Sequence, residues 1–412
     1  MIKEVELRKC EIAQYRNLTE STHYDEIYEY AAKLKGKKII HLNATSSGGG
    51  VAEILNTLVP LMDCVKVNAR WFYIEKNSKF FHLTKEIHNF LQGKKGDLTK
   101  EEKNFFLETN KEMAKEMQSL KPDLWILHDP QPVATQGFLS GSHKAIWRSH
   151  IDTSKTNRKV WNFLLPYLKK YDLYIFSMRR YIGEGLEYKK TRIFPPAIDP
   201  LNQKNVEMDR SSAKKIVGKF GIDTERPLIS QISRFDPWKD PWGVIDAYRV
   251  AKNKFPNLQL ALIGVFSLDD PQAQKIASEL IKYSNKDKNI HILSNKDGVH
   301  ALEVNAFQRV SDIVIQKSIK EGFGMTVTEA MWKEKPVIGG RAGGILEQIE
   351  DGVNGFLVTT VQETADRIVQ LLEDENLAKR MGQKGKETVR KKYLIPRLLR
   401  DHLKLYDEIL NS

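Results

Sequence analysis

Two glutamates frame a glycine-containing turn in the stretch EGFGMTVTE, residues 321–329. Glu321 precedes the turn, and Glu329 lies inside the helix that the following residues predict. Paired carboxylates serve as the acid and the nucleophile or base of glycosidases, in which they lie roughly 5 to 9.5 Å apart. That interpretation does not explain the glycine turn, so we expect the two carboxylates to bind different parts of one elongated ligand.

The turn between the glutamates has features that suit an anion. Gly322 and Gly324 allow a tight turn, and Pro336 ends the predicted helix TVTEAMWKEK. The backbone N–H groups of Gly324 and Met325 should lie at the positive end of this helix, where a phosphate binds. Glu329, about one helical turn further on, would present its carboxylate to the hydroxyls of a ribose beside that phosphate.

A second candidate for phosphate binding follows the predicted strand PLISQIS, residues 227–233. The chain continues as RFDPWKD, in which Arg234 and Lys239 flank the rigid pair Pro237 and Trp238. A guanidinium and an ammonium group together suit a diphosphate, because its oxygens accept charge-assisted hydrogen bonds. Two surface cations without a ligand are the alternative interpretation.

A third loop of this kind lies near the amino terminus, in HLNATSSGGGVAEIL. Gly48, Gly49 and Gly50 have no side chains, so the backbone can approach a ligand, and the helix after them offers free N–H groups. The glycines are consecutive and no acidic residue is placed for a ribose, so the pattern is not a dinucleotide fingerprint. A flexible loop without a ligand is equally compatible with it.

Short apolar runs alternate with helical stretches along the chain, which is typical of parallel sheets flanked by helices. The predicted strands are 37–43, 123–128, 145–150, 172–177, 227–233, 258–264, 289–294, 312–316, 336–340 and 355–359. Between the fourth and the fifth strand, a segment rich in proline and asparagine near 194–210 is interpreted as a linker.

The sequence therefore predicts an α/β fold with two doubly wound Rossmann-like domains. We expect these domains at 1–205 and 206–390, followed by a terminal helix at 391–412. Ligands of such sheets bind at the carboxyl ends of the strands. The two domains should thus face each other across a cleft that holds the active site.

The composition of the chain limits the classes of protein to which it can belong. The N-terminus MIKEVELRKCE is charged and no run of 18 apolar residues occurs, so we expect a cytoplasmic protein with no membrane partner. Only Cys10 and Cys64 are present, and the histidines do not repeat at ligand spacing. We therefore expect no metal site and no required cofactor, which leaves free magnesium open as a companion of a nucleotide.

The net charge of +12 is the remaining compositional signal. Such a charge suits nucleic acid, a membrane surface or a phosphorylated small molecule. Acidic residues are interleaved with the basic ones, as in KGKETVRKKY, and no basic face studded with aromatic residues is visible. We expect a mixed-charge surface and no nucleic-acid partner; a nucleic-acid-binding protein is the alternative from a different class.

The motifs resemble those of a known family. EGFGMTVTE resembles the paired-glutamate motif of the retaining glycosyltransferases of family four, which have the glycosyltransferase-B fold. SRFDPWKD, HALEVNAFQRVSDIVIQKSIKEGFG and GGRAGGILEQIEDGVNGFLV stand in the order of that family, so the resemblance covers nearly the whole chain. In the first domain HLNATSSGGGVAEIL, LHDPQP, IWRSHIDTS and FPPAIDPL resemble the trehalose-forming members.

The resemblance implies that domain 1–205 binds the acceptor, that domain 206–390 binds the nucleotide-sugar donor, and that the terminal helix at 391–412 crosses back to the first domain. It also implies a role for each candidate residue. Glu321, His150, Arg234 and Lys239 would be the catalytic set, with Glu321 at the hydroxyls of the donor sugar and His150 near its anomeric centre. Asp129, Gln131 and Asp152 are implied candidates for the acceptor pocket. The residues implied to bind the donor are Gly49, Gly50, Arg234, Lys239, Ser294, Asn295, Glu321, Gly324, Met325 and Glu329.

The implied reaction moves glucose from ADP-, UDP- or GDP-glucose to free glucose and forms trehalose reversibly. The family resemblance implies a same-face displacement, in which the leaving phosphate helps to remove the proton of the acceptor. A trehalose phosphorylase, which uses phosphate and no nucleotide, and a sucrose-forming or glycan-forming member of the family are the alternatives. The expected partners are NDP-glucose, glucose and trehalose, and a homodimer stays open.

Overall fold

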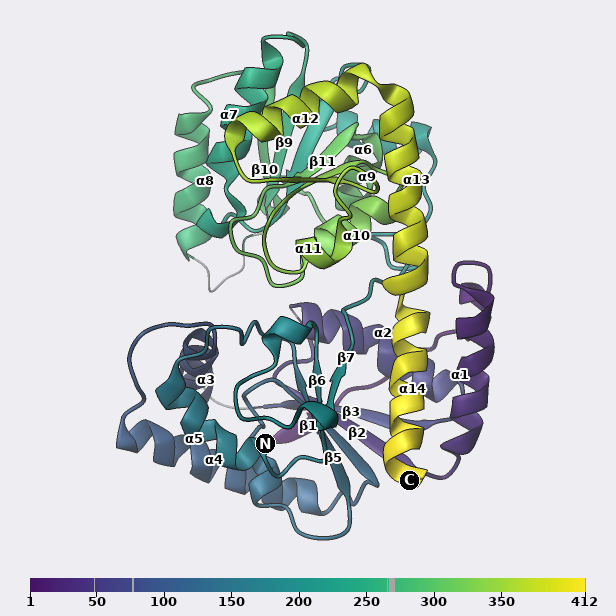
Figure 1. The fold of residues 1–412 in the computed structure, drawn as a ribbon, viewed down its shortest axis with the longest axis vertical. Helices are drawn as coiled ribbons and strands as arrows, with labels where there is room; N and C mark the ends of the chain where they lie inside the picture. The colour runs from purple at the N-terminus through teal and green to yellow at the C-terminus, as the bar shows by residue number, and fades with distance from the viewer. Residues whose placement is uncertain (48, 76–77, 265, 267–270, 412) are drawn as a thin grey trace. The chain divides into compact units, whose positions relative to one another are not determined.

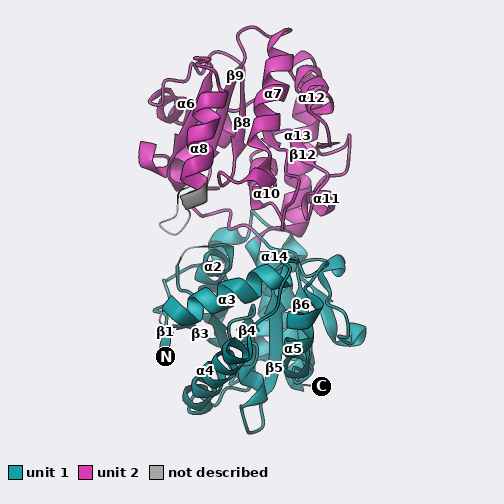
Figure 2. Cartoon of the chain, turned by 90° about the vertical axis from the view of Figure 1, so that its left-hand side faces the viewer, with its two compact units in different colours: residues 1–197, 395–412 teal, residues 198–394 magenta. Residues whose placement is uncertain are grey.

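The computed structural model describes residues 1–411 apart from 48, 76–77, 265 and 267–270. The chain divides into two compact units, each with its own sheet (Figures 1 and 2). Unit 1 comprises residues 1–197 and 395–412, and unit 2 comprises residues 198–394. The predicted fold class, two doubly wound α/β domains, is confirmed by the topology of the two sheets.

The sheet of unit 1 has the strand order β1-β3-β2-β4-β5-β6-β7. Its strands are β1 (Ile2–Glu4), β2 (Lys38–Asn43), β3 (Asn68–Ile74), β4 (Leu124–His128), β5 (Lys144–Ser149), β6 (Leu173–Phe176) and β7 (Thr191–Ile193). Neighbouring strands are parallel except β1, which runs antiparallel to β3 at the sheet edge. An antiparallel edge strand on an otherwise parallel sheet is common in doubly wound folds.

Sequence patterns found the central strands of unit 1 and missed three others. β2 and β4 are almost continuous buried apolar runs, which is what a strand covered on both faces requires. β1 and β7 were missed because each has only one apolar residue among its three and none of them is buried. β3 was missed because its sequence NARWFYI begins with polar residues and mixes exposed with buried positions.

Helices cover both faces of the first sheet (Figure 1). They are α1 (Ser21–Lys33), α2 (Gly50–Cys64), α3 (Ser78–Leu91), α4 (Lys100–Gln118), α5 (Arg158–Leu168) and α14 (Ile395–Asn411). Because side chains alternate along a strand, Ile40 and Leu42 of β2 join the core with α3, α4 and α5, whereas His41 contacts Tyr406 of α14. The terminal helix therefore packs on the face opposite to α3–α5.

The sheet of unit 2 is entirely parallel in its described strands and has the order β10-β9-β8-β11-β12-β13. The strands are β8 (Leu228–Ile232), β9 (Gln259–Gly264), β10 (Ile290–Ser294), β11 (Ile313–Gln316), β12 (Val337–Gly340) and β13 (Phe356–Val358). All six were predicted to within one residue at each end. In chain order this is 3-2-1-4-5-6, the Rossmann arrangement.

The helices of unit 2 also lie on both faces of its sheet. They are α6 (Arg210–Gly218), α7 (Pro241–Lys252), α8 (Pro271–Tyr283), α9 (Ala301–Val310), α10 (Met325–Trp332), α11 (Ile345–Gln348), α12 (Val361–Glu373) and α13 (Glu375–Lys392). One apolar core joins α6 and α9 to the sheet, and another joins α7, α8 and α12 to it.

Each sheet has a topological switch point, where the strand order reverses. It lies between β8 and β11 in unit 2 and between β2 and β4 in unit 1. Loops leaving two such strands diverge, so a crevice forms at their carboxyl ends and ligands bind there. The loops 233–239 and 317–324 follow β8 and β11, and the loops 44–49 and 129–131 follow β2 and β4. Half of the predicted site residues are on these loops.

The first unit boundary lies at 197/198, before the predicted position of 205/206. Much of the segment 194–210, which we expected to be a linker, packs on unit 2. Asn305 Nδ2 donates hydrogen bonds to Gln203 O at 3.0 Å and to Val206 O at 2.8 Å. Proline and asparagine indicated irregular backbone correctly, but irregular backbone with its hydrogen bonds satisfied by a neighbouring helix belongs to that domain.

The second boundary lies at 394/395, where the prediction had 390/391. Tyr393 still belongs to unit 2, because its hydroxyl donates to Glu347 O at 2.8 Å and its ring lies edge-on to Phe323. Ile198 N also donates to Tyr393 O at 2.8 Å, so the two segments at which the chain changes units are hydrogen-bonded to each other. The helix after this point, α14, is part of unit 1 beside α1 (Figure 1).

Candidate active site

Lys239 and Glu321 form an ion pair at the switch point of unit 2. Lys239 Nζ lies 2.8 Å from Glu321 Oε1, and the two side chains are 14% and 9% exposed. Glu321 Oε2 also accepts hydrogen bonds from Gln316 Nε2 at 3.2 Å and from Ser318 Oγ at 3.0 Å. Donors from both loops thus hold the carboxylate in one position, as precise recognition of a ligand requires.

The loop after β8 is folded around Asp236. Asp236 Oδ1 accepts a hydrogen bond from Trp238 N at 2.8 Å, and Asp236 Oδ2 lies 3.2 Å from Arg234 Nη2. Gln231 Nε2 donates to Lys239 O at 2.7 Å, which fixes the end of the loop. The Arg234 side chain is 64% exposed, so its guanidinium can reach an anion from solvent, whereas the Lys239 ammonium is already in place.

A second ion pair at the same edge was missed by sequence reasoning. Lys317 Nζ pairs with the Asp240 carboxylate, and the two side chains are 7% and 19% exposed. Asp240 also caps α7 by accepting a hydrogen bond from Gly243 N at 3.2 Å. The signal available in the sequence was the position of Lys317 directly after β11. Lys239 lies on the loop after β8, and both strands border the switch point.

Glycines after β12 allow its loop to approach the carboxylate loop. A Cβ atom on Gly343, whose φ is +50°, would lie 1.7 Å from Glu321 O, and one on Gly340 would lie 2.2 Å from Ser318 O. Gly324 caps α10 with a φ of 85°, which places it in the left-handed region that favours glycine. The backbone of the motif GGRAGG (339–344) therefore packs closely against the backbone of the loop that carries Glu321.

Glu329 is buried in α10, with 6% of its surface exposed. Gln308 Nε2 lies 3.4 Å from its Oε2, and Lys333 Nζ donates to Glu329 O at 3.1 Å and to Asn205 Oδ1 at 2.9 Å. Burial lowers the pKa of Lys333 to about 7, and the Glu329 carboxylate acts in the opposite direction. The residue predicted to bind a ribose thus sits among polar groups of α9, α10 and the segment after the boundary.

Ser294 and Asn295, which we expected to bind the donor, are the last residue of β10 and the first residue after it. Ser294 Oγ donates to Asp297 Oδ2 at 2.7 Å. Asn295 Oδ1 accepts from Phe266 N at 2.8 Å, and its Nδ2 donates to Phe266 O at 3.1 Å. Both side chains stabilise the loop itself, so any contact with a base at this place falls to the backbone.

The glycine loop of unit 1 is open beside its backbone. Gly48 lies outside the described residues. Gly49 has a φ of 90° and precedes α2, which begins at Gly50, and a Cβ atom on either residue would meet nothing within 4 Å. Asn43 Nδ2 donates to Thr45 O at 2.7 Å and holds the start of the loop. A ligand can therefore approach this backbone closely.

Asp129 and His150 connect the ends of β4 and β5. Asp129 adopts a φ of 62°, and its Oδ1 accepts a hydrogen bond from His150 N at 2.8 Å. Burial raises the pKa of Asp129 to about 7, although the His150 N–H and the Arg148 guanidinium act to lower it. Burial lowers the pKa of His150 well below its usual value, and Arg148 adds to this. Near neutral pH the site thus presents a neutral imidazole and a carboxyl group that exchanges its proton readily.

Gln131 and Asp152 are the other two candidates for the acceptor pocket, and they differ in whether their side chains are already hydrogen-bonded. Gln131 Oε1 is buried and has no hydrogen-bond partner within the described part of the chain. Asp152 Oδ1 accepts from Ser154 N at 3.0 Å and from Ser154 Oγ at 2.6 Å. Gln131 therefore has an acceptor to offer to a hydroxyl, whereas Asp152 is engaged in its own turn. Among described residues, no hydrogen bond joins either of them to Asp129 or His150.

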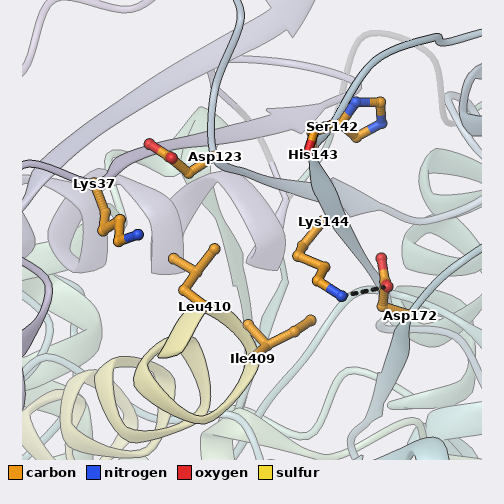
Figure 3. A pocket seen from close by; sticks show the side chains of 8 residues that line it. All are labelled: Lys37, Asp123, Ser142, His143, Lys144, Asp172, Ile409 and Leu410. Carbon is orange, nitrogen blue, oxygen red and sulfur yellow. Dashed lines mark ion pairs between the residues drawn. The ribbon is translucent and has the colours of Figure 1, made fainter. Parts of the chain in front are cut away.

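A polar pocket of unit 1 lies at the amino ends of the strands, whereas the candidate site residues lie towards the carboxyl ends (Figure 3). It is lined by Lys37, Asp123, Ser142, His143, Lys144, Asp172, Ile409 and Leu410. Asp172 pairs with Lys144 at 3.5 Å and accepts from Ala145 N at 2.8 Å, and Asp123 accepts from Lys38 N at 2.8 Å. These aspartates tie the amino ends of strands together, and the pocket contains no predicted site residue.

Two features are absent from the described residues. No three of their histidine, cysteine, aspartate or glutamate side chains are arranged to hold a metal ion. None of their helices combines the length and the apolar character that a bilayer span needs.

Comparison with known proteins assigns the family. Residues 41–183 match the model "Trehalose synthase, N-terminal domain", and residues 212–388 match the model "Glycosyl transferases group 1". The trehalose synthase of Pyrococcus horikoshii is 45% identical over 412 residues, which cover 100% of this chain and 98% of the relative. The chain belongs to the trehalose synthase family of glycosyltransferases.

The chain also resembles more distant proteins at lower identity. A trehalose phosphorylase of Pleurotus pulmonarius is 26% identical over 429 residues, which cover 90% of this chain but 57% of the relative. The solved structure of sucrose-phosphate synthase from Thermosynechococcus elongatus has a TM-score of 0.69 at 14% identity and covers 91% of this chain and 99% of that chain. The glycosyltransferase-B fold and the family predicted from EGFGMTVTE are confirmed.

Proposed function

We propose that this member of the trehalose synthase family transfers glucose from an NDP-glucose to free glucose and forms trehalose with retention of the donor's configuration. The observation that carries the proposal is the Lys239–Glu321 pair at the switch point of unit 2. An ammonium group suits a leaving diphosphate, and a fixed carboxylate suits the hydroxyls of a sugar. The pair therefore matches the junction between the two parts of a nucleotide sugar.

The charges of unit 2 suit the transition state of this reaction. Cleavage of the bond between the anomeric carbon and the diphosphate leaves negative charge on the diphosphate. Lys239 and the exposed Arg234 carry positive charge at the edge where that group would lie. Because the negative charge grows as the bond breaks, these cations stabilise the transition state more than the bound donor.

In a same-face displacement, the proton of the acceptor hydroxyl is taken up by the leaving group. The hydroxyl of the acceptor forms the new bond to the anomeric carbon on the side from which the diphosphate departs. Its proton passes to the departing phosphate oxygen, so the products are trehalose and protonated NDP. Glu321 already accepts hydrogen bonds from two side chains besides its ion pair, which favours a role in binding donor hydroxyls over one as nucleophile.

Unit 1 offers groups for neutral sugar hydroxyls. Gln131 Oε1 can accept a hydroxyl hydrogen bond that it lacks in the described structure. Asp129 can accept or donate, because its pKa of about 7 leaves both protonation states populated near neutral pH. The proposal needs no resident metal ion, and free magnesium enters it only as a companion of the nucleotide.

Product analysis tests the proposal. The protein is incubated with ADP-, UDP- or GDP-glucose plus glucose, and in parallel with trehalose plus phosphate. We expect equal amounts of trehalose and NDP in the first set with at least one of the nucleotides, and nuclear magnetic resonance should show only α linkages. Glucose phosphate formed from trehalose and phosphate, with no NDP in the first set, would identify a phosphorylase instead.

A further inference from the structure

Five buried or half-buried side chains of unit 1 form one hydrogen-bonded chain. His150 Nε2 lies 3.0 Å from His128 Nδ1, and His128 Nε2 lies 3.1 Å from His41 Nδ1. His41 Nε2 lies 3.3 Å from the Tyr406 hydroxyl, which lies 3.2 Å from His402 Nδ1. The chain thus runs from the loop after β5, through the ends of β4 and β2, to two residues of α14.

The imidazoles of this chain are neutral. Burial lowers the pKa of His41 to about 3 and lowers those of His128 and His402 well below the usual value. The neighbouring Arg148 acts in the same direction on His128 and His402, because a second positive charge near a buried guanidinium is unfavourable. A protonated member would therefore have to overcome both burial and like-charge repulsion.

Neutrality couples the proton positions along the chain. A neutral imidazole has one N–H donor and one acceptor nitrogen, and a hydroxyl donates one hydrogen bond. When the Tyr406 hydroxyl donates within the chain, all four hydrogen bonds can therefore form in only two ways, one with every donor pointing towards α14 and one with every donor pointing towards His150. In the first, His150 Nδ1 is an acceptor; in the second, it carries the proton.

The outer nitrogen of His150 is free to meet a ligand. His150 Nε2 is used by the chain, and His150 Nδ1 makes no hydrogen bond to any residue that the structure describes. His150 is half-buried at the carboxyl end of β5, where Asp129 Oδ1 accepts its backbone N–H. At the far end, His402 Nε2 is likewise without a hydrogen-bond partner in the described part of the chain.

We propose that the chain formed by His402, Tyr406, His41 and His128 sets the tautomer of His150, so that His150 Nδ1 meets a sugar hydroxyl as donor or acceptor without a change in charge. When the arrangement reverses, each member passes one proton to its neighbour. Solvent water gives one proton to His150 Nδ1 and solvent takes up the one that leaves His402 Nε2, so protons and charge balance. Tyr406 and His402 are positioning residues, and their role rests on the proposed function only where His150 contacts a sugar.

Tyr406→Phe tests the proposal, because it removes the hydroxyl that connects His41 to His402 and keeps the ring. The full chain is labelled with ¹⁵N-histidine, and ring-nitrogen shifts, which distinguish the two tautomers, are recorded without substrate. The signal of His150 is assigned by its absence in His150→Gln. We expect the His150 tautomer populations in Tyr406→Phe to differ from those of the unaltered protein.

Tyr171→Phe is the matched control, because Tyr171 is a fully buried tyrosine of unit 1 whose hydroxyl donates to Val133 O at 2.8 Å outside the chain. It should lower the melting temperature as Tyr406→Phe does and leave the His150 shifts unchanged. In transfer assays, Tyr406→Phe should lower kcat about tenfold with KM for NDP-glucose unchanged, which corresponds to one lost hydrogen bond. A structural role alone would not separate the two parameters.

Unchanged His150 shifts in Tyr406→Phe would overturn the proposal whatever the activity. If Tyr406→Phe does not fold, His402→Phe takes its place, since it removes the last acceptor of the chain, and unchanged shifts there have the same meaning. The spectra need no substrate, so they stand even if the protein forms no trehalose. Trehalose formation with unchanged tautomers would refute the relay and leave the proposed function intact.

Discussion

Unit 1 and unit 2 place their candidate residues at equivalent points of two doubly wound sheets, but with opposite electrostatic character. In unit 2 the side chains at the switch point are ionised and paired, as in Lys239–Glu321 and Lys317–Asp240. In unit 1 the corresponding side chains are neutral imidazoles, in hydrogen-bonded series, and a carboxyl group with a pKa of about 7. The two sheets share one kind of topology, but the side chains at their switch points are charged in unit 2 and mainly neutral in unit 1.

The difference fits the proposed function, in which the donor is a nucleotide sugar with a charged and an uncharged part. A diphosphate carries charge that increases during transfer, so cations held at a fixed position favour its departure. A glucose molecule is uncharged, and neutral donors and acceptors bind its hydroxyls without a costly buried charge. Four measurements test this contrast, in order of decreasing expected effect.

The largest effect should be the loss of stability of unit 1 in acid. The pKa values of His41, His128, His150 and His402 lie below 6.5 in the folded protein, so below pH 6.5 the unfolded chain binds protons that the folded unit does not. Asp129, whose pKa is raised, acts oppositely between about pH 4 and 7 and offsets one histidine. The free energy of unfolding should fall by up to about 4 kcal/mol per pH unit below 6.5.

Hydrogen-exchange mass spectrometry at pH 7.0 and 5.5 measures this for each unit separately, after correction for intrinsic exchange. Among the described histidines of unit 2, a lowered pKa is resolved only for His291, so its peptides should lose less protection. His402→Phe should reduce the pH dependence in unit 1, and His300→Gln, an exposed position of unit 2, should not. Equal losses in both units would contradict the contrast.

Glu321→Ala should have the largest effect on catalysis. It removes the carboxylate that Lys239, Gln316 and Ser318 hold in place, and the rate of sugar transfer should fall on the order of 10²–10³-fold, as for other fixed polar groups that act on a transition state. Calorimetric affinity for the nucleotide should be largely preserved. Glu225→Ala, which breaks an exposed ion pair with Lys214, is the control. Unchanged turnover would exclude Glu321 from the site.

Lys239→Ala should weaken the binding of NDP. The charge-assisted hydrogen bond to a diphosphate contributes about 1.5 to 3 kcal/mol, so the dissociation constant should rise roughly 10- to 150-fold. Lys254→Ala removes an ammonium that pairs with Glu373 on the surface, and it should leave the affinity unchanged. If both variants bind NDP equally well, the diphosphate does not lie at the end of β8.

Glu329→Gln should have the smallest effect, about tenfold in the dissociation constant of NDP, because a neutral amide accepts ribose hydroxyls less strongly than a carboxylate. The affinity for inorganic diphosphate should not change, since that ligand has no ribose. A parallel loss for both ligands would assign Glu329 to the support of α10, to which its buried position also contributes.

The sequence predicted unit 2 better than unit 1, for a physical reason. The strands of unit 2 are short runs of buried apolar residues, and turns or prolines mark many of their ends. β3 in unit 1 mixes exposed and buried positions, and β1 has one apolar residue among its three, so neither gave a pattern to detect. The linker was placed too far along the chain because composition does not tell which domain satisfies the hydrogen bonds of an irregular segment.

The candidate residues of unit 2 were likewise easier to predict from the sequence than those of unit 1. Glu321 and Lys239 were identified because each belongs to a motif of several residues at recognisable spacing. The histidine chain was missed because its members are isolated in sequence; His41 and Tyr406 are 365 residues apart. A weak signal did exist, since His41, His128 and His150 lie at or near the carboxyl ends of β2, β4 and β5, which are neighbours in the sheet.

By itself the sequence determined which local elements form and which chemical groups they carry, because strand patterns, glycine turns and capping depend on neighbouring residues. Tertiary structure alone decided which of those groups meet. It paired Lys239 with Glu321 across 82 positions and joined α14 to β2 through Tyr406. It also set the charge of each group, because burial and the proximity of Arg148 are properties of the packed unit, and these keep the imidazoles neutral.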